Sequence, residues 1–339
     1  MKKVIHFLVL VFVCASISHA QQDKHYSMFF ASPAQLNAGA AGHFEGDVQL
    51  FTNFRSQWFS ISQNPFRSFS GSVDGRLFEE RLYGSFIGAG MNIYNDQSGD
   101  GQFKVNIISF PINYSLQLNK TSHLALGIQP AYYSQSFNES ALYFDSQWQG
   151  DGFNTAISSG ENLGILNVNK FDLSSGLYYS NKPKKNLSYK FGVSGNHLTK
   201  QRIGFYSLNE KLYRNISFFG QLDYSRPNSL LTFHPAIFAF FQGPNRELTA
   251  GGNFEFQLKP PSIHTMYFDG QSISVGTYYR FKDAFIANLI YNAGSLSLGV
   301  AYDMNLSGLT VASNGKGAFE LYLSFKPEFR RGFGSPRIN

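Results

Sequence analysis

Cysteine is almost missing from this chain, which has a single cysteine, Cys14, among its 339 residues. Cys14 lies within an N-terminal stretch that has the pattern of an export signal, so the exported chain would contain no cysteine. This excludes disulfides and thiolate chemistry, and it suits a protein that works in an oxidising compartment. Lipid attachment at Cys14 is disfavoured, because the bulky Val13 precedes it.

Charged residues and long apolar runs are also scarce. Charged residues make up 15% of the chain, against about 25% in a typical soluble domain, whereas aromatic residues reach 17%. Beyond the N-terminal stretch, no segment offers the roughly 18 consecutive apolar residues of a transmembrane helix. A helical membrane protein is therefore excluded. A chain of this kind that spans a membrane must close a β-barrel, because lipid cannot satisfy the edge of an open sheet.

Motifs for catalysis and metal binding are missing as well. No two of the eight histidines have HExxH spacing, and no GxSxG motif occurs. Residues 96–101 resemble the start of a calcium loop, but Ile107 stands where such a loop needs a bidentate glutamate. The sequence therefore predicts no catalytic residue, no metal and no cofactor. Gly88 and Gly90 have no dinucleotide-binding context, and we expect them to admit close packing or bending of a barrel wall.

Positive charge is present but dispersed. The formal net charge is +6, and it is spread thinly except at the C-terminus, where Lys326, Arg330, Arg331 and Arg337 oppose only Glu328. A nucleic-acid binder concentrates its positive charge in a patch or stripe. Nucleic acid is therefore not an expected partner.

The first twenty residues predict a cleaved signal peptide. Lys2 and Lys3 form the positive start, residues 4–15 the apolar core, and residues 18–20 a cleavage site of small residues. The exported chain would then begin at Gln21.

From Val48 onward, apolar and polar residues alternate in runs of about 10 to 15 residues. Residues 296–305 show this most clearly, since every second side chain is apolar and those between are small or polar; residues 48–59 and 319–325 repeat it. One face suits lipid and the other suits a polar lumen. The same pattern predicts about fourteen strands: 48–60, 66–78, 82–94, 102–118, 121–135, 169–181, 187–198, 211–225, 230–242, 245–258, 271–282, 284–293, 295–305 and 316–325.

These strands predict an all-β fold: a transmembrane antiparallel β-barrel with long extracellular loops and short periplasmic turns. A soluble β-sandwich would alternate too, but its strands are usually shorter and its surface more charged. With the N-terminus in the periplasm, the longest connection, 136–168, faces outside, whereas 259–270 is long for a periplasmic turn. We expect Phe51, Phe59 and Tyr322 to point inward and fill the lumen.

The expected organisation has four parts, two of which lie outside the barrel on the periplasmic side. They are a signal peptide (1–20), a periplasmic N-terminal segment (21–46), the outer-membrane β-barrel (47–325) and a basic periplasmic tail (326–339).

Three stretches carry a family resemblance. Residues 25–42 contain HYS and SPAQLNAGAAG, residues 54–58 are FRSQW, and residues 301–321 contain AYDMN and LTVASNGKGAFEL. Together they resemble the opening, first-strand and closing-hairpin motifs of the PorP/SprF family, outer-membrane proteins of the type IX secretion system of Bacteroidota. Ala38 is a departure, because the family often has proline there, and Asn53–Phe54 replaces the commoner aromatic pattern. These departures leave the particular partner open.

The resemblance implies a non-enzymatic outer-membrane component that supports export or surface anchoring of specific cell-surface proteins such as adhesins, including those used in gliding. The implied partners are other type IX secretion components, a secreted adhesin or its C-terminal signal domain, and outer-membrane lipid. Cargo would meet residues 136–168 and 306–315, and periplasmic machinery residues 21–46 and 326–339. The candidate partner-binding residues are Tyr26, Pro33, Asn37, Arg55, Trp58, Asp303, Asn305, Glu320, Arg330 and Arg331.

Two alternatives remain. The first is an outer-membrane porin or solute channel, which would need an open lumen and has no need of the opening and closing motifs. The second is a barrel enzyme such as a lipid hydrolase, which would need a serine and a histidine in contact near one rim.

Overall fold

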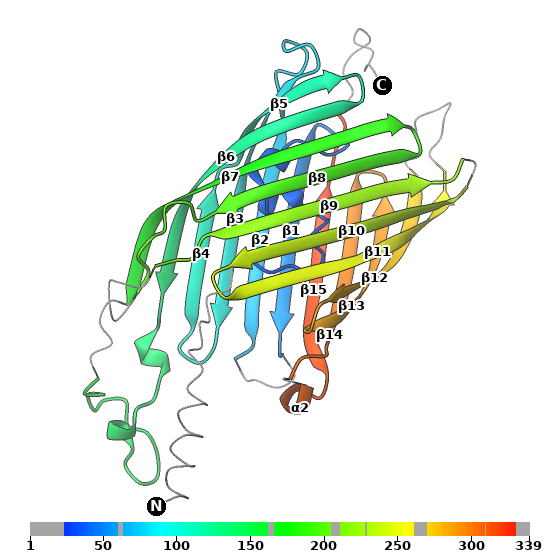
Figure 1. Ribbon diagram of the computed structural model, residues 1–339. Coiled ribbons are helices and arrows are strands. Elements are labelled where there is room, and N and C mark those ends of the chain that lie inside the picture. Colours follow the sequence, from blue (N-terminus) through cyan, green and yellow to red (C-terminus); the bar gives the residue numbers. More distant parts are fainter. Residues whose placement is uncertain are drawn as a thin grey trace, which may run out of the picture.

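One antiparallel sheet closes on itself in the computed structural model, which describes residues 24–59, 64–161, 166–204, 211–227, 229–260, 270–308 and 310–329. β1 (Val48–Gln57) pairs with β2 (Phe66–Leu77) on one side and with β15 (Lys316–Phe325) on the other (Figure 1). The other strands follow in chain order: β3 (Phe86–Ser98), β4 (Phe103–Ser109), β5 (Ile112–Asn119), β6 (Ser122–Ser136), β7 (Asn167–Lys184), β8 (Leu187–Asn196), β9 (Asn215–Ser225), β10 (Leu231–Gln242), β11 (Asn245–Lys259), β12 (Gln271–Arg280), β13 (Ala284–Ala293) and β14 (Leu296–Asn305).

β4 and β5 are two halves of one strand. Both pair with β3 and β6, and the register is unchanged across the break, with Ser109 opposite Asn92 and Ile112 opposite Ala89. Pro111 lies at the break, and proline has no N–H to donate to the ladder. The fifteen strand elements therefore form a closed barrel of fourteen strands, which confirms the predicted fold class.

The two faces of the wall alternate as the sequence predicted. In β14, Leu296 and Met304 are exposed on the outside, whereas Ala301 and Asp303 are buried on the lumen side. Inward-pointing aromatics are confirmed at Phe51 and Tyr322, whose rings stack with centroids 5.6 Å apart. Phe59 is the exception, because it follows the end of β1 and is exposed.

Helical structure in the described residues is confined to short pieces. No helix in the described part of the chain is long and apolar enough to cross a membrane. The helical elements are η1 (Pro33–Gln35), η2 (Ala38–Ala40), η3 (Glu139–Ala141), η4 (Asp145–Gln147) and α2 (Thr310–Ser313).

β3 begins four residues later than predicted. Tyr83 and Gly84 have φ angles of 53° and 90°, which place them in a turn rather than a strand. β3 instead continues to Ser98, so Asp96 is a strand residue that accepts a hydrogen bond from Ser68 Oγ at 2.6 Å. The residues that resemble the start of a calcium loop are thus partly strand.

The two ends of the barrel differ. The loop end carries the connections 58–65, 137–166, 197–214 and 306–315, whereas the turn end carries the two-residue turns 120–121, 185–186 and 294–295 together with the start of β1 and the end of β15. Figure 1 draws the loop end at the bottom and the turn end at the top. The connection between β11 and β12, noted from the sequence as long, lies almost entirely outside the described residues.

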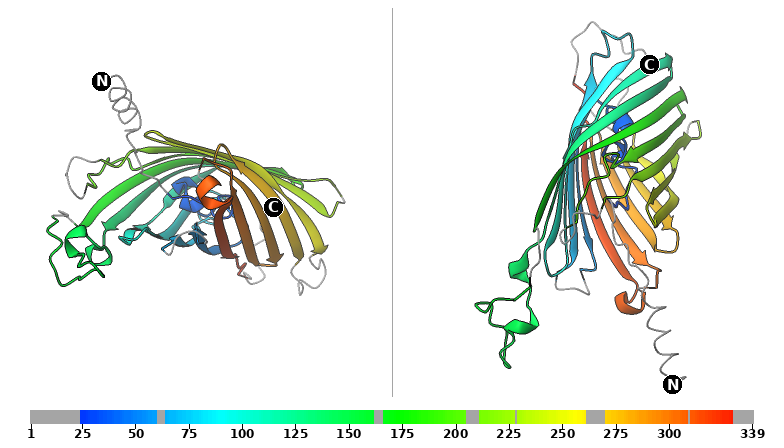
Figure 2. Two further views of the ribbon diagram at one scale, coloured as in Figure 1. Left: turned by 90° about the horizontal axis from the view of Figure 1, so that it is seen from below. Right: turned by 60° about the vertical axis from the view of Figure 1, so that its left-hand side comes forward.

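Residues 24–46, called the lumen segment below, lie inside the barrel (Figure 2). The prediction that the N-terminal segment lies outside the barrel is therefore wrong for these residues. The alternation of apolar and polar residues along a strand indicates which side chains face the lumen, but it does not indicate what fills the lumen. η2 packs against β5, β6, β7 and β8, which are neighbouring strands of the wall. Residues 1–23, including the predicted signal peptide, lie outside the described residues.

Candidate functional site

The lumen segment runs from the loop end of the barrel to the turn end. Near the loop end, His25 Nδ1 lies 2.8 Å from a carboxylate oxygen of Glu247, close to the start of β11. Near the turn end, the backbone N–H of Gly42 donates to Asp74 at 2.8 Å, and that of Asp47 donates to the Pro327 carbonyl at 3.1 Å. The chain therefore passes through the whole barrel before it forms β1.

Aromatic side chains hold the first part of the lumen segment. Phe29 stacks on Phe238 with centroids 5.5 Å apart and meets Tyr278 edge-on at 5.6 Å. Phe30 stacks on Tyr278, with ring centroids 5.2 Å apart. Offset stacks and edge-on contacts each contribute about 0.5–1.5 kcal/mol beyond their buried area. Two consecutive phenylalanines thus connect the lumen segment to β10 and β12.

Small residues let the second part of the lumen segment approach the wall. Ala38, Gly39 and Ala41 are buried, and the facing wall positions are glycines. A Cβ placed on Gly127 would lie 2.6 Å from the carbonyl carbon of Ala38, and one on Gly88 would clash with the Ala41 carbonyl oxygen. The expectation that Gly88 admits close packing is therefore confirmed, and the backbone it admits is the protein's own.

Asn37 joins the lumen segment to two strands. Its side-chain oxygen accepts the Gly39 N–H at 2.8 Å and caps η2, and its Nδ2 donates to the carbonyls of Leu177 at 3.1 Å and Val193 at 3.3 Å. From the wall, Asn113 Nδ2 donates to the Ala38 and Ala41 carbonyls at 3.1 and 2.9 Å. Backbone groups that would otherwise be buried without partners are satisfied in this way.

Four charged side chains surround Ser27; together they are called the charged clamp: Arg55, Arg280, Asp303 and Glu320. Glu320 accepts the backbone N–H groups of Ser27 and Met28 at 2.7 and 2.9 Å. The Ser27 hydroxyl donates to Asp303 at 2.8 Å and accepts from Arg55 and Arg280.

The charged clamp is paired internally. Arg55 lies 3.1 Å from Asp303 and 3.4 Å from Glu320, and Arg280 lies 3.1 Å from Asp303. Glu320 is completely buried and the other three members are almost so. A buried charge is costly unless it is paired and hydrogen-bonded, and removal of one partner typically costs about 3–5 kcal/mol. The charged clamp therefore fixes the start of the lumen segment firmly.

The structure brings together three of the predicted partner-binding residues, Arg55, Asp303 and Glu320, which the sequence separates by up to 265 positions. With Tyr26, Asn37 and Asn305 they are buried in the barrel, so none of these six offers a surface to a partner while the lumen segment is in place. Asn305 organises the connection to β15, because its side chain accepts the Ser307 N–H at 2.9 Å.

The remaining predicted residues lie elsewhere. Pro33 is half-buried and begins η1. Trp58 follows β1 at the loop end, where its ring centroid lies 4.9 Å from that of Phe66. Arg330 and Arg331 lie outside the described residues.

Ser27, Glu247 and Arg280 were not among the predicted site residues. A signal for the two wall residues exists in the sequence, because a charged side chain at a lumen-facing position of a strand needs a partner inside the barrel. No such signal exists for Ser27, whose partners are Asp303 and Glu320, 276 and 293 residues away in the sequence.

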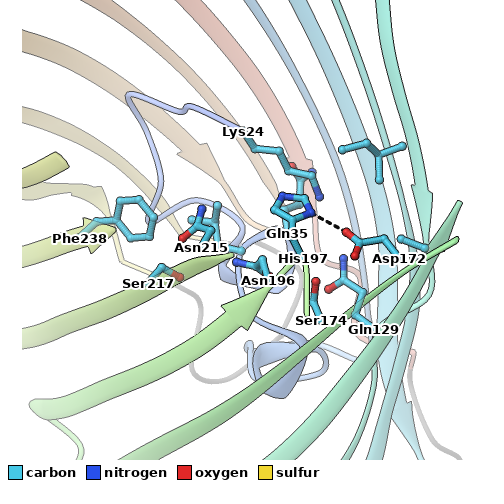
Figure 3. A pocket seen from close by; sticks show the side chains of 13 residues that line it. Lys24, Gln35, Gln129, Asp172, Ser174, Asn196, His197, Asn215, Ser217 and Phe238 are labelled. Atoms are coloured by element: carbon cyan, nitrogen blue, oxygen red, sulfur yellow. Dashed lines mark hydrogen bonds and ion pairs between the residues drawn. The ribbon is translucent and has the colours of Figure 1, made fainter. Parts of the chain in front are cut away.

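A small pocket lies beside the lumen segment near the loop end (Figure 3). Lys24 and Gln35 line it from the lumen segment, and Asp172 and His197 line it from the wall. His197 Nδ1 lies 2.5 Å from a carboxylate oxygen of Asp172, whose other oxygen accepts from Thr199 at 2.9 Å. The pocket has a polar wall but, among the described residues, no group of three side chains that could hold a metal ion.

A Ser–His contact of the kind that the enzyme alternative needs occurs near the turn end. His43 Nδ1 lies 3.0 Å from Ser180 Oγ. The other ring nitrogen is buried without a hydrogen-bond partner, so no carboxylate orients the ring as a catalytic triad requires. The ring packs 5.0 Å from Phe86 and 5.1 Å from Tyr178, which is a structural role.

No curated protein matches the sequence. Among solved structures, the barrel is similar to the Ralstonia pickettii toluene transporter TbuX (9% identity, TM-score 0.48, 88% of this chain and 93% of that chain) and to the P. putida toluene transporter TodX (9%, 0.47, 87% and 93%). It is also similar to a Pseudomonas aeruginosa FadL homologue (11%, 0.46, 86% and 92%). At these identities the likeness concerns the fold alone.

The family model for the type IX secretion system membrane protein PorP/SprF matches residues 18–325. The match includes the lumen segment, the charged clamp and every strand of the barrel. The chain therefore belongs to the PorP/SprF family of type IX secretion system membrane proteins and is an outer-membrane β-barrel.

Proposed function

We propose that this protein is a non-enzymatic component of the type IX secretion system that supports export or surface anchoring of specific cell-surface proteins such as adhesins. The family match over residues 18–325 carries the proposal. Its partners would be other secretion components and an exported protein or the C-terminal signal domain of that protein.

The occupied lumen supports a binding role at the ends of the barrel. By the usual asymmetry of bacterial barrels the loop end faces outside and the turn end faces the periplasm. Exported protein would then meet the connections 137–166 and 306–315. Secretion components would meet the turn end, where the lumen segment emerges at Glu45 and the C-terminal tail begins at Lys326. Glu45 is exposed there and pairs with Lys182 at 2.7 Å.

A solute channel is the alternative. The feature that favours it is the inner face of the barrel wall, which carries many polar side chains, such as Ser115, Asn253 and Ser274. The lumen segment, however, occupies the path that a solute would take from one end to the other. The channel alternative therefore requires that this segment leave the lumen.

Deletion of the gene should remove one or a few large proteins from the cell surface, and a plasmid copy should restore them. Quantitative mass spectrometry of surface-shaved cells measures this, with uptake of small solutes followed in the same strains. An unchanged surface proteome together with reduced solute uptake would contradict the secretion proposal and favour the channel.

A further inference from the structure

The longest connection at the loop end has a fold of its own. Residues 137–161 project beyond the rim of the barrel, away from the strands (Figures 1 and 2). Gln147 organises them: its side chain accepts the Phe144 N–H at 3.2 Å and donates to the Ile157 carbonyl at 2.9 Å. Its carbonyl accepts the Asn154 N–H at 2.8 Å. This projection is therefore held in one shape by its own hydrogen bonds.

Three aromatic side chains gather on this projection. Tyr143 and Trp148 both pack against Phe153, with ring centroids 5.0 and 4.9 Å away. They nevertheless remain 64%, 50% and 45% exposed, in the order Tyr143, Trp148 and Phe153. Exposed aromatics on the strands face lipid, but these lie beyond the strand ends. A contiguous apolar patch held above the membrane marks an interaction surface.

The charge around this aromatic cluster indicates the partner. Residues 137–161 contain no Lys, Arg or His, in a chain whose formal net charge is +6. Guanidinium and ammonium groups bind the faces of aromatic rings and pair with carboxylates, so this combination suits Arg and Lys side chains. Anionic lipid headgroups and acidic polysaccharides would be repelled. The acidic residues are Glu139, Asp145, Asp151 and Glu161.

We propose that Tyr143, Trp148 and Phe153, with Asp145 and Asp151 beside them in the sequence, dock a segment of the exported protein that bears arginine and lysine. This inference rests on the proposed secretion role and names the surface that would perform it. Aromatic anchors in a fixed arrangement lose little conformational entropy on binding. The neighbouring carboxylates would select partners by charge.

Photo-crosslinking in cells tests the docking surface. With p-benzoylphenylalanine in place of Tyr143, irradiation should yield an adduct with an exported surface protein, located by mass spectrometry next to its Arg or Lys residues. The same probe at Arg246, which is exposed at the loop end of β11, is the matched control and should yield at least fivefold less adduct.

Charge and packing variants complete the test. Asp145→Lys with Asp151→Lys should lower the adduct yield at least fivefold, as should Trp148→Ser with Phe153→Ser. The projection lies outside the barrel, so the abundance and heat-modifiable migration of these variants should stay at wild-type levels.

Three outcomes would overturn the inference: adducts with lipopolysaccharide or polysaccharide, no adduct with an exported protein, or an adduct yield that charge reversal does not change. If gene deletion depletes surface proteins but these variants do not, the docking surface fails while the secretion role stands; if deletion depletes none, the secretion role itself fails.

Discussion

Deletion of residues 24–41 is expected to convert a closed barrel into an open pore. Eight-stranded barrels are filled by their own side chains, whereas barrels of 16 to 18 strands enclose a water-filled channel. A barrel of fourteen strands lies between these sizes, so its wall side chains leave part of the lumen unfilled. Here the lumen segment fills that space. Without it, lumen-facing residues such as Asn92, Asn113 and Ser194 would lose their partners in the lumen segment and become hydrated.

Conductance in planar bilayers measures the change. The intact protein should give only background current, and the deletion variant should raise the current roughly tenfold or more, as expected when a polar barrel lumen fills with water. Deletion of residues 143–160, a stretch of the same length from the outer projection, is the control and should leave the current at background. A large stable current from the intact protein would show that the lumen segment does not close the pore.

Replacement of Glu320 by alanine is expected to release the start of the lumen segment. The substitution leaves the N–H groups of Ser27 and Met28 without their acceptor and removes one partner of Arg55. Loss of one partner from a buried charge network costs about 3–5 kcal/mol. The barrel strands keep their own hydrogen bonds, so the lost free energy should mainly weaken the binding of the lumen segment to the wall.

A thiol placed at Ser32 reports this release directly. Ser32 is buried in the lumen segment, and the exported chain has no other cysteine if the predicted signal peptide is removed. In Ser32→Cys, modification by a water-soluble maleimide should be slow. Adding Glu320→Ala should accelerate it roughly a hundredfold or more. The loss of about 3–5 kcal/mol favours local opening of the lumen segment, and each 1.4 kcal/mol corresponds to about a factor of ten in that opening. Glu320→Gln keeps one acceptor oxygen and should fall between the two. Equal labelling rates in all three proteins would mean that the charged clamp does not hold the lumen segment.

The sequence predicted the wall of the barrel well because each strand has two different surroundings. Lipid on one side and a polar lumen on the other impose a period of two, which is visible in residues 296–305 without any tertiary information. The error at β3 has a local cause. Tyr83 adopts a positive φ, and nothing in the alternation of residues 82–94 reveals that turn.

The contents of the lumen were not predictable in the same way. The lumen segment has neither strand nor helix periodicity, and its partners come from strands that are far apart in the sequence. Arg55, Asp303 and Glu320 were selected only because they lie in motifs that resemble the PorP/SprF family. Their common role at Ser27 becomes visible only when the barrel closes and brings β1, β14 and β15 together.

The position of the lumen segment is the central claim, and an engineered disulfide tests it most directly. Ser32 Oγ in the lumen segment lies 3.5 Å from Ser72 Oγ on β2. Ser32→Cys with Ser72→Cys should therefore form a disulfide in the exported protein with little backbone movement, and mass spectrometry of unreduced peptides should find the linked pair in most molecules. Ser32→Cys with Thr52→Cys, where Thr52 is exposed on the outer face of β1, should remain unlinked. If both introduced thiols of the Ser32→Cys, Ser72→Cys variant stayed free and open to maleimide in the folded barrel, that result would contradict the claim that the N-terminal segment occupies the lumen.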